Sequence, residues 1–253
     1  MPQTLTPSAT QLDGVSRCSR YAFGPNRLHL CGPDANQEVL AYIGEGAVDL
    51  GLTHILRGFA TLYPYLDQIA RSNNIRDPFD ARVVEAYWLG NTLLETIPAR
   101  TFFQHLRDTL DLKRKYGAKQ FNQLAQKIPQ GRMHHSFHVM NAYKRTGHDA
   151  KLHTLESMDS CRVSWGKVTE VVGPKVTVLR RPLELNGHQL QLGQEAVSHV
   201  TRRLDNDFAL DDLAPGDLVT MHWNVICEKV TPEQVKQLWA YTEQAMRLSN
   251  TTN

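Results

Sequence analysis

The sequence predicts an α+β protein: an N-terminal all-α helical domain, then a small OB-like β-barrel that carries a C-terminal helix. Apolar residues recur at helical spacing over the first 150 residues, whereas after residue 161 they alternate with polar ones in short segments separated by turns. A chain of 253 residues allows two ordinary domains. We expect the helical domain at residues 1–150 and the barrel with its helix at residues 160–248.

The helical domain is predicted from periodicity and from start signals. Prolines and glycines interrupt every period in residues 1–36, so no regular structure is expected there. Asp77-Pro78 is typical of a helix start, because an N-cap is followed by proline at the first helical position. The polar segment Gly147–Ser160 is typical of a linker. The helices are expected from Pro33, over Leu50–Arg71, from Asp77, and over Thr101–Lys115, Ala118–Ile128 and His134–Arg145.

The barrel is predicted from strand-like segments and turn signals. Asn186-Gly187 is a strong type I′ turn signal between two such segments. The chain then closes with a helix over Thr231–Leu248, in which Thr231 and Gln234 are placed to form a capping box. Short strands followed by one amphipathic helix favour a closed or nearly closed OB-like barrel. The strands are expected at Arg162–Val168 and Lys175–Leu179, in a hairpin over Leu183–Leu192, and at Leu218–Ile226.

Charge and hydropathy exclude some classes of function. Lysine and arginine number 28 against 26 acidic residues, so no general attraction to nucleic acid is expected. The chain has no apolar run of about 18 residues and no signal-peptide pattern at its start, which favours a cytoplasmic protein without membrane contact. Four scattered cysteines are too few for a disulfide framework, so we expect free thiols.

Two motifs in the C-terminal third carry the main functional hypothesis. Cys161-Arg-Val-Ser-Trp-Gly-Lys-Val168 places a thiol where the first strand opens. Pro215-Gly-Asp-Leu-Val-Thr-Met-His222 brings a histidine to the middle of the last expected strand, just before the C-terminal helix. A buried, incidental thiol and a hydrogen-bonded core histidine are the structural alternatives.

Together, these motifs and the helix resemble the HypC/HupF hydrogenase assembly chaperones over residues 160–248. The resemblance implies a non-enzymatic chaperone in which Cys161 and His222 help to hold an iron centre while cyanide and carbon monoxide are installed on it. It also implies a HypD-like partner and the hydrogenase large subunit as the receiver. A thiolate and an imidazole suit ferrous iron. The sequence departs from the family because Cys161 is internal and Trp165 replaces a proline.

The N-terminal part offers weaker candidates, and it resembles an uncharacterised helical family that implies no activity. Cys18 and Cys31 have no zinc-finger spacing. In the cluster His134-His-Ser-Phe-His138, a helix would place His134 and His138 on one face, and His135 beside His138. Structural cysteines and exposed histidines near a helix end are the favoured interpretation.

Two other classes of function remain open. Cys18, Cys31, His134 and His138 could form the metal or redox site of an enzyme that takes part in hydrogenase cofactor assembly. An OB-type module that binds oligonucleotides is the third class, and the near-neutral charge argues against it.

Overall fold

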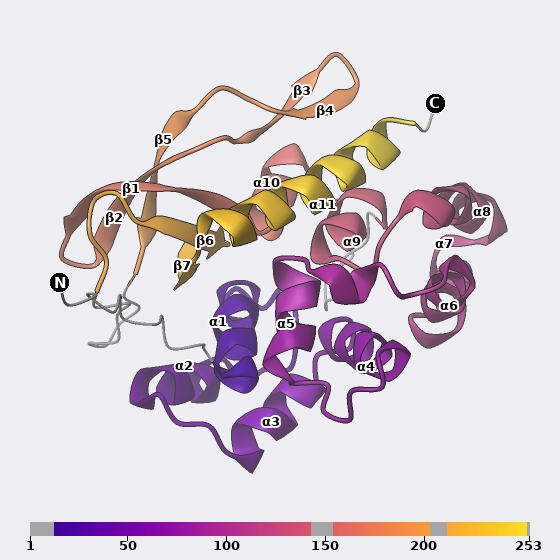
Figure 1. The fold of residues 1–253 in the computed structure, drawn as a ribbon, viewed down its shortest axis with the longest axis horizontal. Coiled ribbons are helices and arrows are strands. Elements are labelled where there is room, and N and C mark those ends of the chain that lie inside the picture. The colour runs from indigo at the N-terminus through magenta and orange to yellow at the C-terminus, as the bar shows by residue number, and fades with distance from the viewer. Residues whose placement is uncertain (1–12, 143–153, 203–211, 252–253) are drawn as a thin grey trace, which may run out of the picture.

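The computed structural model describes residues 13–142, 154–202 and 212–251. An N-terminal helical region is followed by a sheet region and a C-terminal helix, which confirms the predicted α+β class. Helix α11 (Pro232–Asn250) runs along the boundary between the strands and the N-terminal helices (Figure 1). It packs most extensively on α9 (His135–Asn141), so the last element of the chain covers the end of the helical region.

The helical region consists of short helices joined by tight turns. A π-helical turn at His105–Thr109 and two 3₁₀ turns, at Thr92–Leu94 and Ile128–Gln130, connect some of them. Besides α9, the helices are α1 (Gly14–Asn26), α2 (Asn36–Glu45), α3 (Leu50–Arg57), α4 (Leu62–Ser72), α5 (Ala81–Trp88), α6 (Ala99–Gln104), α7 (Leu112–Tyr116) and α8 (Ala118–Lys127).

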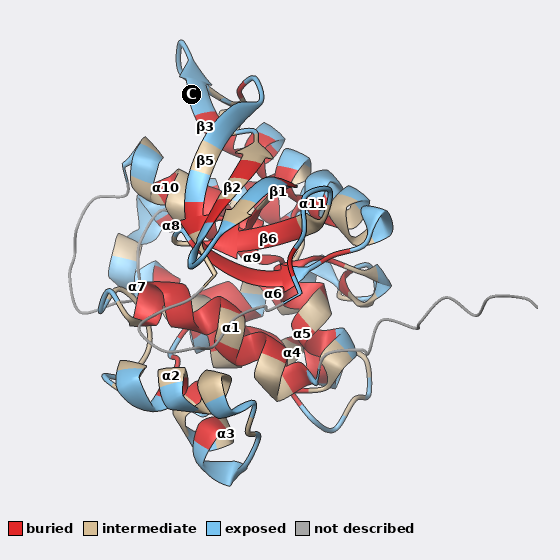
Figure 2. Cartoon of the chain, turned by 90° about the vertical axis from the view of Figure 1, so that its left-hand side faces the viewer, coloured by how far each residue is buried: buried red, intermediate tan, exposed pale blue. Residues whose placement is uncertain are grey.

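Helix α1 corrects the prediction that residues 1–36 are irregular; residues 1–12 of that range lie outside the described part. The Asp13 side chain caps the helix by accepting hydrogen bonds from the backbone N–H groups of Val15 and Ser16. Burial then outweighs the poor helix propensity of Gly24 and Pro25, since most of α1 is buried between the other helices and the sheet (Figure 2). A sequence rich in helix breakers thus forms one of the central helices.

Three other predicted helices have different limits. The expected helix Leu50–Arg71 is two helices, α3 and α4, separated after Gly58. Helix α5 begins three residues later than Asp77 suggested, because the Asp80 side chain accepts from Arg82 N at 2.9 Å and acts as the N-cap. The expected helix Thr101–Lys115 is interrupted by the π-helical turn.

The expected linker Gly147–Ser160 is helical in its described part. Residues 143–153 lie outside the described residues, which also leaves the end of the expected helix His134–Arg145 undescribed. From residue 155 the chain forms α10 (Leu155–Cys161), capped by Thr154, whose hydroxyl accepts from Ser157 N at 3.1 Å. Most residues of this helix are half-buried and Met158 is buried, so the described part of the segment is packed on the protein rather than a free linker.

Five strands form a curved sheet in the order β1-β2-β5-β7-β6, in which β6 pairs back to β1. This is the strand order of an OB-like barrel, as predicted. The parallel contact between β5 and β7 consists of one residue pair, Thr201 with Val225, so the barrel is not fully closed. The strands are β1 (Ser164–Val172), β2 (Lys175–Arg180), β5 (Ala196–Thr201), β6 (Leu218–His222) and β7 (Val225–Lys229).

One of two hairpins was predicted from the sequence, and the other was not. Strands β3 (Leu183–Asn186) and β4 (Gln189–Leu192) form the predicted separate hairpin, with Gly187 at φ +61°. The single strand predicted over Leu218–Ile226 is instead the β6–β7 hairpin, because Trp223 and Asn224 turn the chain with φ of +52° and +61°. His222 therefore ends a strand rather than occupying its middle. Strand β5 was not predicted at all.

The helical and sheet regions share one hydrophobic core. It joins Tyr21 of α1 and Tyr65 of α4 with Val163, Cys227 and Leu238 from the C-terminal third, while a smaller apolar cluster fills the barrel. A buried ion pair also links the regions, since Arg17 Nε lies 3.1 Å from a Glu228 carboxylate oxygen. The two parts are therefore packed as one body in the described structure.

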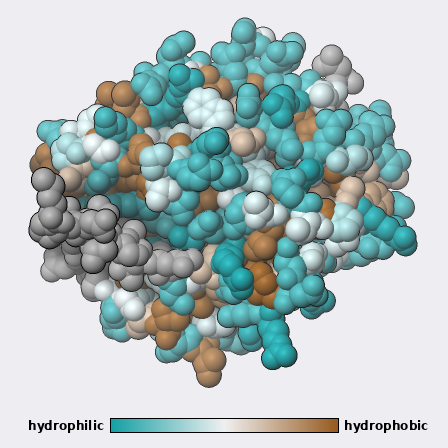
Figure 3. Space-filling model, viewed as in Figure 1, coloured by the Kyte–Doolittle hydropathy of each residue, from teal (hydrophilic) through white to brown (hydrophobic). Residues whose placement is uncertain are grey.

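Hydrophilic residues predominate on the face shown in Figure 3, and hydrophobic ones are scattered in small groups. Among the described residues, no helix is long and apolar enough to cross a membrane.

Candidate metal centre

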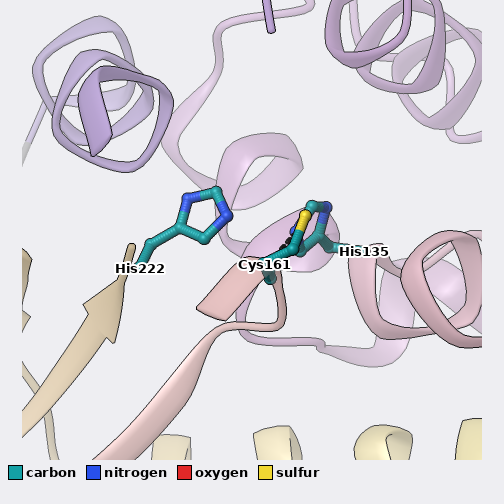
Figure 4. A group of neighbouring side chains, drawn as sticks. All are labelled: His135, Cys161 and His222. Carbon is teal, nitrogen blue, oxygen red and sulfur yellow. Dashed lines mark hydrogen bonds between the residues drawn. The ribbon is translucent and has the colours of Figure 1, made fainter. Parts of the chain in front are cut away.

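Three side chains from distant parts of the chain meet where the helices contact the end of the sheet (Figure 4). His135 is the first residue of α9, Cys161 the last of α10 and His222 the last of β6. The potential ligand atoms of these residues all lie within 4.8 Å of one another. Cys161 and His222 were the two residues singled out from the sequence. His135 was paired there with His138 rather than with them.

Both imidazole rings are oriented by backbone carbonyl groups. His222 Nδ1 lies 2.6 Å from the carbonyl oxygen of Tyr21, and His135 Nε2 lies 2.8 Å from that of Cys161. A carbonyl oxygen only accepts, so each of these nitrogens carries a proton and the other nitrogen of each neutral ring holds a lone pair. His222 Nε2 is buried without a hydrogen-bond partner among the described residues, and His135 Nδ1 lies 3.1 Å from the Tyr87 hydroxyl.

Burial keeps both rings neutral. It lowers the pKa of His222 to about 4, although the carbonyl groups of Tyr21 and Cys161 favour the protonated ring. It also lowers the pKa of His135 well below its ordinary value, and the nearby His222 contributes to this shift. Both residues therefore offer imidazole lone pairs at neutral pH without prior loss of a proton.

Cys161 is held in place through its neighbours. The buried Arg162 side chain pairs with Asp159 at 2.9 Å and donates to the carbonyl oxygen of Arg181 at 2.6 Å. Asp159 also accepts from Arg180 and from the backbone N–H of Leu183, both at 2.9 Å. These contacts fix the end of α10 against the strands, and with it the position of the half-buried thiol.

The β6–β7 turn is fixed from two sides. Trp223 N donates to the carbonyl oxygen of Ser160 at 2.9 Å, so the residue after His222 is bonded to the residue before Cys161. On the other side, a Cβ at Gly24 would lie 2.5 Å from the carbonyl oxygen of His222. Glycine is therefore required for α1 to approach the strand this closely.

An indole ring forms a wall of the site. The Trp88 ring lies 4.6 Å from the His135 ring and 5.5 Å from the His222 ring, measured between centroids. It is in turn stacked on Tyr21 at 5.1 Å. This packing restricts the rotation of both imidazole rings.

A cavity with a volume of about 60 Å³ adjoins the three residues. His135, Cys161 and His222 all line it, together with a mainly apolar set. No lysine, arginine, aspartate or glutamate is among the described lining residues. The remaining lining residues are Ala22, Pro25, Leu30, Cys31, Phe59, Thr61, Leu62, Tyr87, Trp88, His138, Val139 and Trp223.

The weaker candidates are not brought together into a second metal group within the described residues. Cys18 is fully buried in the core, and burial raises the pKa of its thiol. Cys31 and His138 line the cavity beside the three residues above. His134 caps α9 by accepting from Ser136 N at 3.1 Å and stacks on Tyr241.

The prediction that the histidine cluster is exposed is wrong. His134, His135 and His138 are all at most 8% exposed, because α9 lies between α11 and the helical core. The i, i+4 spacing of His134 and His138 does not indicate whether the cluster is buried. His135, which joins Cys161 and His222, has no histidine at this spacing.

A single family model matches residues 10–253, which includes the helices, the sheet and the three converging side chains. The chain belongs to DUF6390, a family of unknown function. No curated protein and no solved structure shows significant similarity to this DUF6390 chain.

The family match overturns the resemblance to the HypC/HupF chaperones. It covers residues 160–248 together with the helical part, so the C-terminal third is one portion of a DUF6390 protein and not a fused chaperone module. The structure supplies a physical reason. Strands and C-terminal helix share their core with the N-terminal helices. Cys161 also does not open the first strand as expected, because it ends α10 and β1 begins only at Ser164.

Proposed function

We propose that this DUF6390 protein binds one transition-metal ion through His135, Cys161 and His222. The convergence of these residues carries the proposal: each imidazole donates one N–H to a backbone carbonyl oxygen and keeps a lone pair on its other nitrogen, and a ring nitrogen of each histidine lies within 4.8 Å of the Cys161 thiol. Histidine ligands in metal sites commonly have their second nitrogen oriented in this way. The buried Nε2 of His222 has no hydrogen-bond partner in the described part of the chain, which is a costly feature unless the atom binds a ligand.

The donor set favours a transition metal over calcium or magnesium. Two imidazoles and a thiolate suit iron, zinc and copper, whereas calcium and magnesium prefer oxygen ligands. Bonds of about 2.0–2.3 Å in a tetrahedral site place ligand atoms roughly 3.5 Å apart. The atoms lie within 4.8 Å of one another, so shifts of about 1 Å by the three side chains would complete the site.

We propose that the bound ion is iron. We also propose that the iron keeps an open coordination position at which a further ligand can bind. Three protein ligands leave at least one position free in a four-coordinate site, as in catalytic rather than structural metal sites. A cytoplasmic setting, which keeps the thiol reduced, is part of the proposal. Service to a hydrogenase, a HypD-like partner and an iron–cyanide–carbonyl cargo stay untested predictions, and the metal site does not depend on them.

The proposal is tested by metal analysis of full-length protein purified without oxygen, followed by titration of the metal-free protein with ferrous iron and cobalt. We expect about one ion per chain and a thiolate-to-cobalt charge-transfer band. Cys161→Ser, His135→Gln and His222→Gln should each weaken binding on the order of 100-fold or more, since each removes a ligand. Cys31→Ser is the matched control, because it removes another half-buried thiol from the same cavity.

Different results would overturn different parts. Zinc in place of iron would refute the choice of ion and keep the site. A folded wild-type protein that binds no transition metal would refute the function. Loss of the cobalt band in Cys31→Ser but not in Cys161→Ser would refute the assignment of the thiol ligand.

A further inference from the structure

We propose that the cavity beside the three ligands admits a small, uncharged molecule to the open position of the bound metal. This inference rests on the proposed function and goes beyond it, because it assigns a class of ligand to the site. His135, Cys161 and His222 line the cavity themselves, so a molecule inside it is adjacent to all three metal-binding side chains.

The size of the cavity limits the ligand. A buried water needs roughly 10–15 Å³ of space that is open to a water-sized sphere. The cavity of about 60 Å³ therefore has room for about four to six waters, or for one molecule of a few non-hydrogen atoms. A nucleotide, a sugar or a peptide side chain with its backbone would not fit without displacement of core residues such as Phe59.

The lining determines the polarity of the ligand. Leu30, Leu62 and Val139 provide aliphatic surface, and no charged side chain is present among the described lining residues. The Cys31 thiol stays uncharged at neutral pH, because burial raises its pKa to about 11. A divalent ion with one thiolate retains a positive charge, which attracts anions, yet the walls offer no cationic side chain to hold an oxyanion.

A few polar groups besides the metal ligands line the cavity, among them the Thr61 hydroxyl and the Trp88 indole N–H. The hydroxyl of Thr61, which lines the cavity and is 6% exposed, has no hydrogen-bond partner among the described residues. A buried hydroxyl without a partner is uncommon in folded proteins. The site is therefore suited to a small molecule with one donor atom for the metal and a mainly apolar body.

Isocyanides test the inference because they are neutral, bind ferrous iron through carbon and differ only in the size of the alkyl group. Methyl isocyanide should bind to the iron-loaded protein with at least about tenfold higher affinity than tert-butyl isocyanide. Leu30→Ala should enlarge the half-buried edge of the cavity and reduce this preference. Leu30→Trp should weaken binding of both ligands, and iron content should stay unchanged in both variants.

The matched control is Leu28→Ala, which shortens a leucine two residues away that does not line the cavity. It should leave the preference between the two isocyanides unchanged. Azide serves as a small anionic ligand for comparison. Its affinity for the iron-loaded protein should not follow the changes that the two Leu30 variants cause in isocyanide affinity. Iron-loaded protein that binds both isocyanides equally, or neither, would overturn the inference and leave the proposed function standing. Failure to load iron would instead count against the proposed function.

Discussion

His222 Nδ1 donates a hydrogen bond to the carbonyl oxygen of Tyr21 at 2.6 Å, across 201 positions of the chain. This bond joins the end of β6 to α1 and determines which ring nitrogen of His222 keeps its lone pair. Tyr21 is itself held by Glu228, which accepts from its hydroxyl at 2.9 Å. The orientation of a candidate metal ligand therefore depends on the contact between the first helix and the sheet.

Gly24→Ala should disturb that contact. The new Cβ would lie 2.5 Å from the carbonyl oxygen of His222, so α1 and β6 must separate. We expect a loss of about 1–3 kcal/mol in the free energy of unfolding, as for overpacked cores, together with weaker metal binding. Urea unfolding and cobalt titration measure the two effects. Ser16→Ala on the same helix is the control, and equal behaviour of the two variants would contradict the role given to Gly24.

Tyr87→Phe should preserve or strengthen metal binding. The Tyr87 hydroxyl lies 3.1 Å from His135 Nδ1, the nitrogen that carries the lone pair, so the hydroxyl and a metal ion compete for it. Removal of the hydroxyl leaves the ring packing with His135 in place. Cobalt affinity measured by titration checks the prediction. A tenfold or larger loss of affinity, a change of about 1.4 kcal/mol, would show that His135 does not bind through Nδ1.

Asp159→Ala should loosen Cys161 without touching it. Asp159 pairs with Arg162 and Arg180 and accepts from Leu183 N, so its loss leaves the buried Arg162 guanidinium uncompensated. Removal of one partner of a buried ion pair typically costs about 3–5 kcal/mol. Unfolding and metal titration should both report the loss. Glu156→Ala, an exposed acidic position on the same helix, should change neither; a comparable effect there would point to general helix weakening.

His105→Phe should reduce the acid sensitivity of the protein. Burial lowers the pKa of His105 to about 3, and neither ring nitrogen has a hydrogen-bond partner among the described residues. The unfolded state, with a pKa near 6.5, binds the proton first as pH falls, so wild-type stability decreases between pH 6.5 and about 3. At pH 5 this amounts to roughly 2 kcal/mol.

Urea unfolding at pH 8 and pH 5 checks this prediction. The stability of His105→Phe relative to wild type should be higher at pH 5 than at pH 8 by roughly that amount. The comparison between the two pH values cancels any constant effect of the larger ring on packing. An equal difference at both values would contradict the prediction, because it would mean that folding leaves the pKa of His105 unchanged.

The sequence predicted those elements that are stabilised by interactions within a few neighbouring residues. The capping box of Thr231 and Gln234 is present at the start of α11, and β3 and β4 form the expected hairpin, although its turn residues are Gly187 and His188 because Asn186 pairs with Gln189. Both depend on hydrogen bonds or dihedral angles within a few residues. Helix α1 and the β6–β7 hairpin were missed because burial and sheet pairing outweighed the propensities of Gly24, Pro25 and Trp223.

Two residues of the candidate site could likewise be predicted from the sequence, and the third could not. The residue types of Cys161 and His222 and their neighbouring motifs predict that both bind a metal, and the structure brings the two side chains together. The third member was hidden, since the partners of His135 lie 26 and 87 residues further along the chain and no spacing rule connects them. The family comparison was needed to correct the resemblance that the two motifs suggested.

The sequence by itself therefore determined the α+β class, the succession of a helical part, a strand-rich part and a terminal helix, and the chemical character of two side chains. The tertiary structure alone decided that His135 joins them, that burial keeps both imidazoles neutral, and that a cavity without charged side chains among its described lining residues adjoins all three. The physical reason is that composition and periodicity act over a few residues. The site, in contrast, is made by the packing of α1, α9 and α10 against the end of β6, which only the folded chain brings into contact.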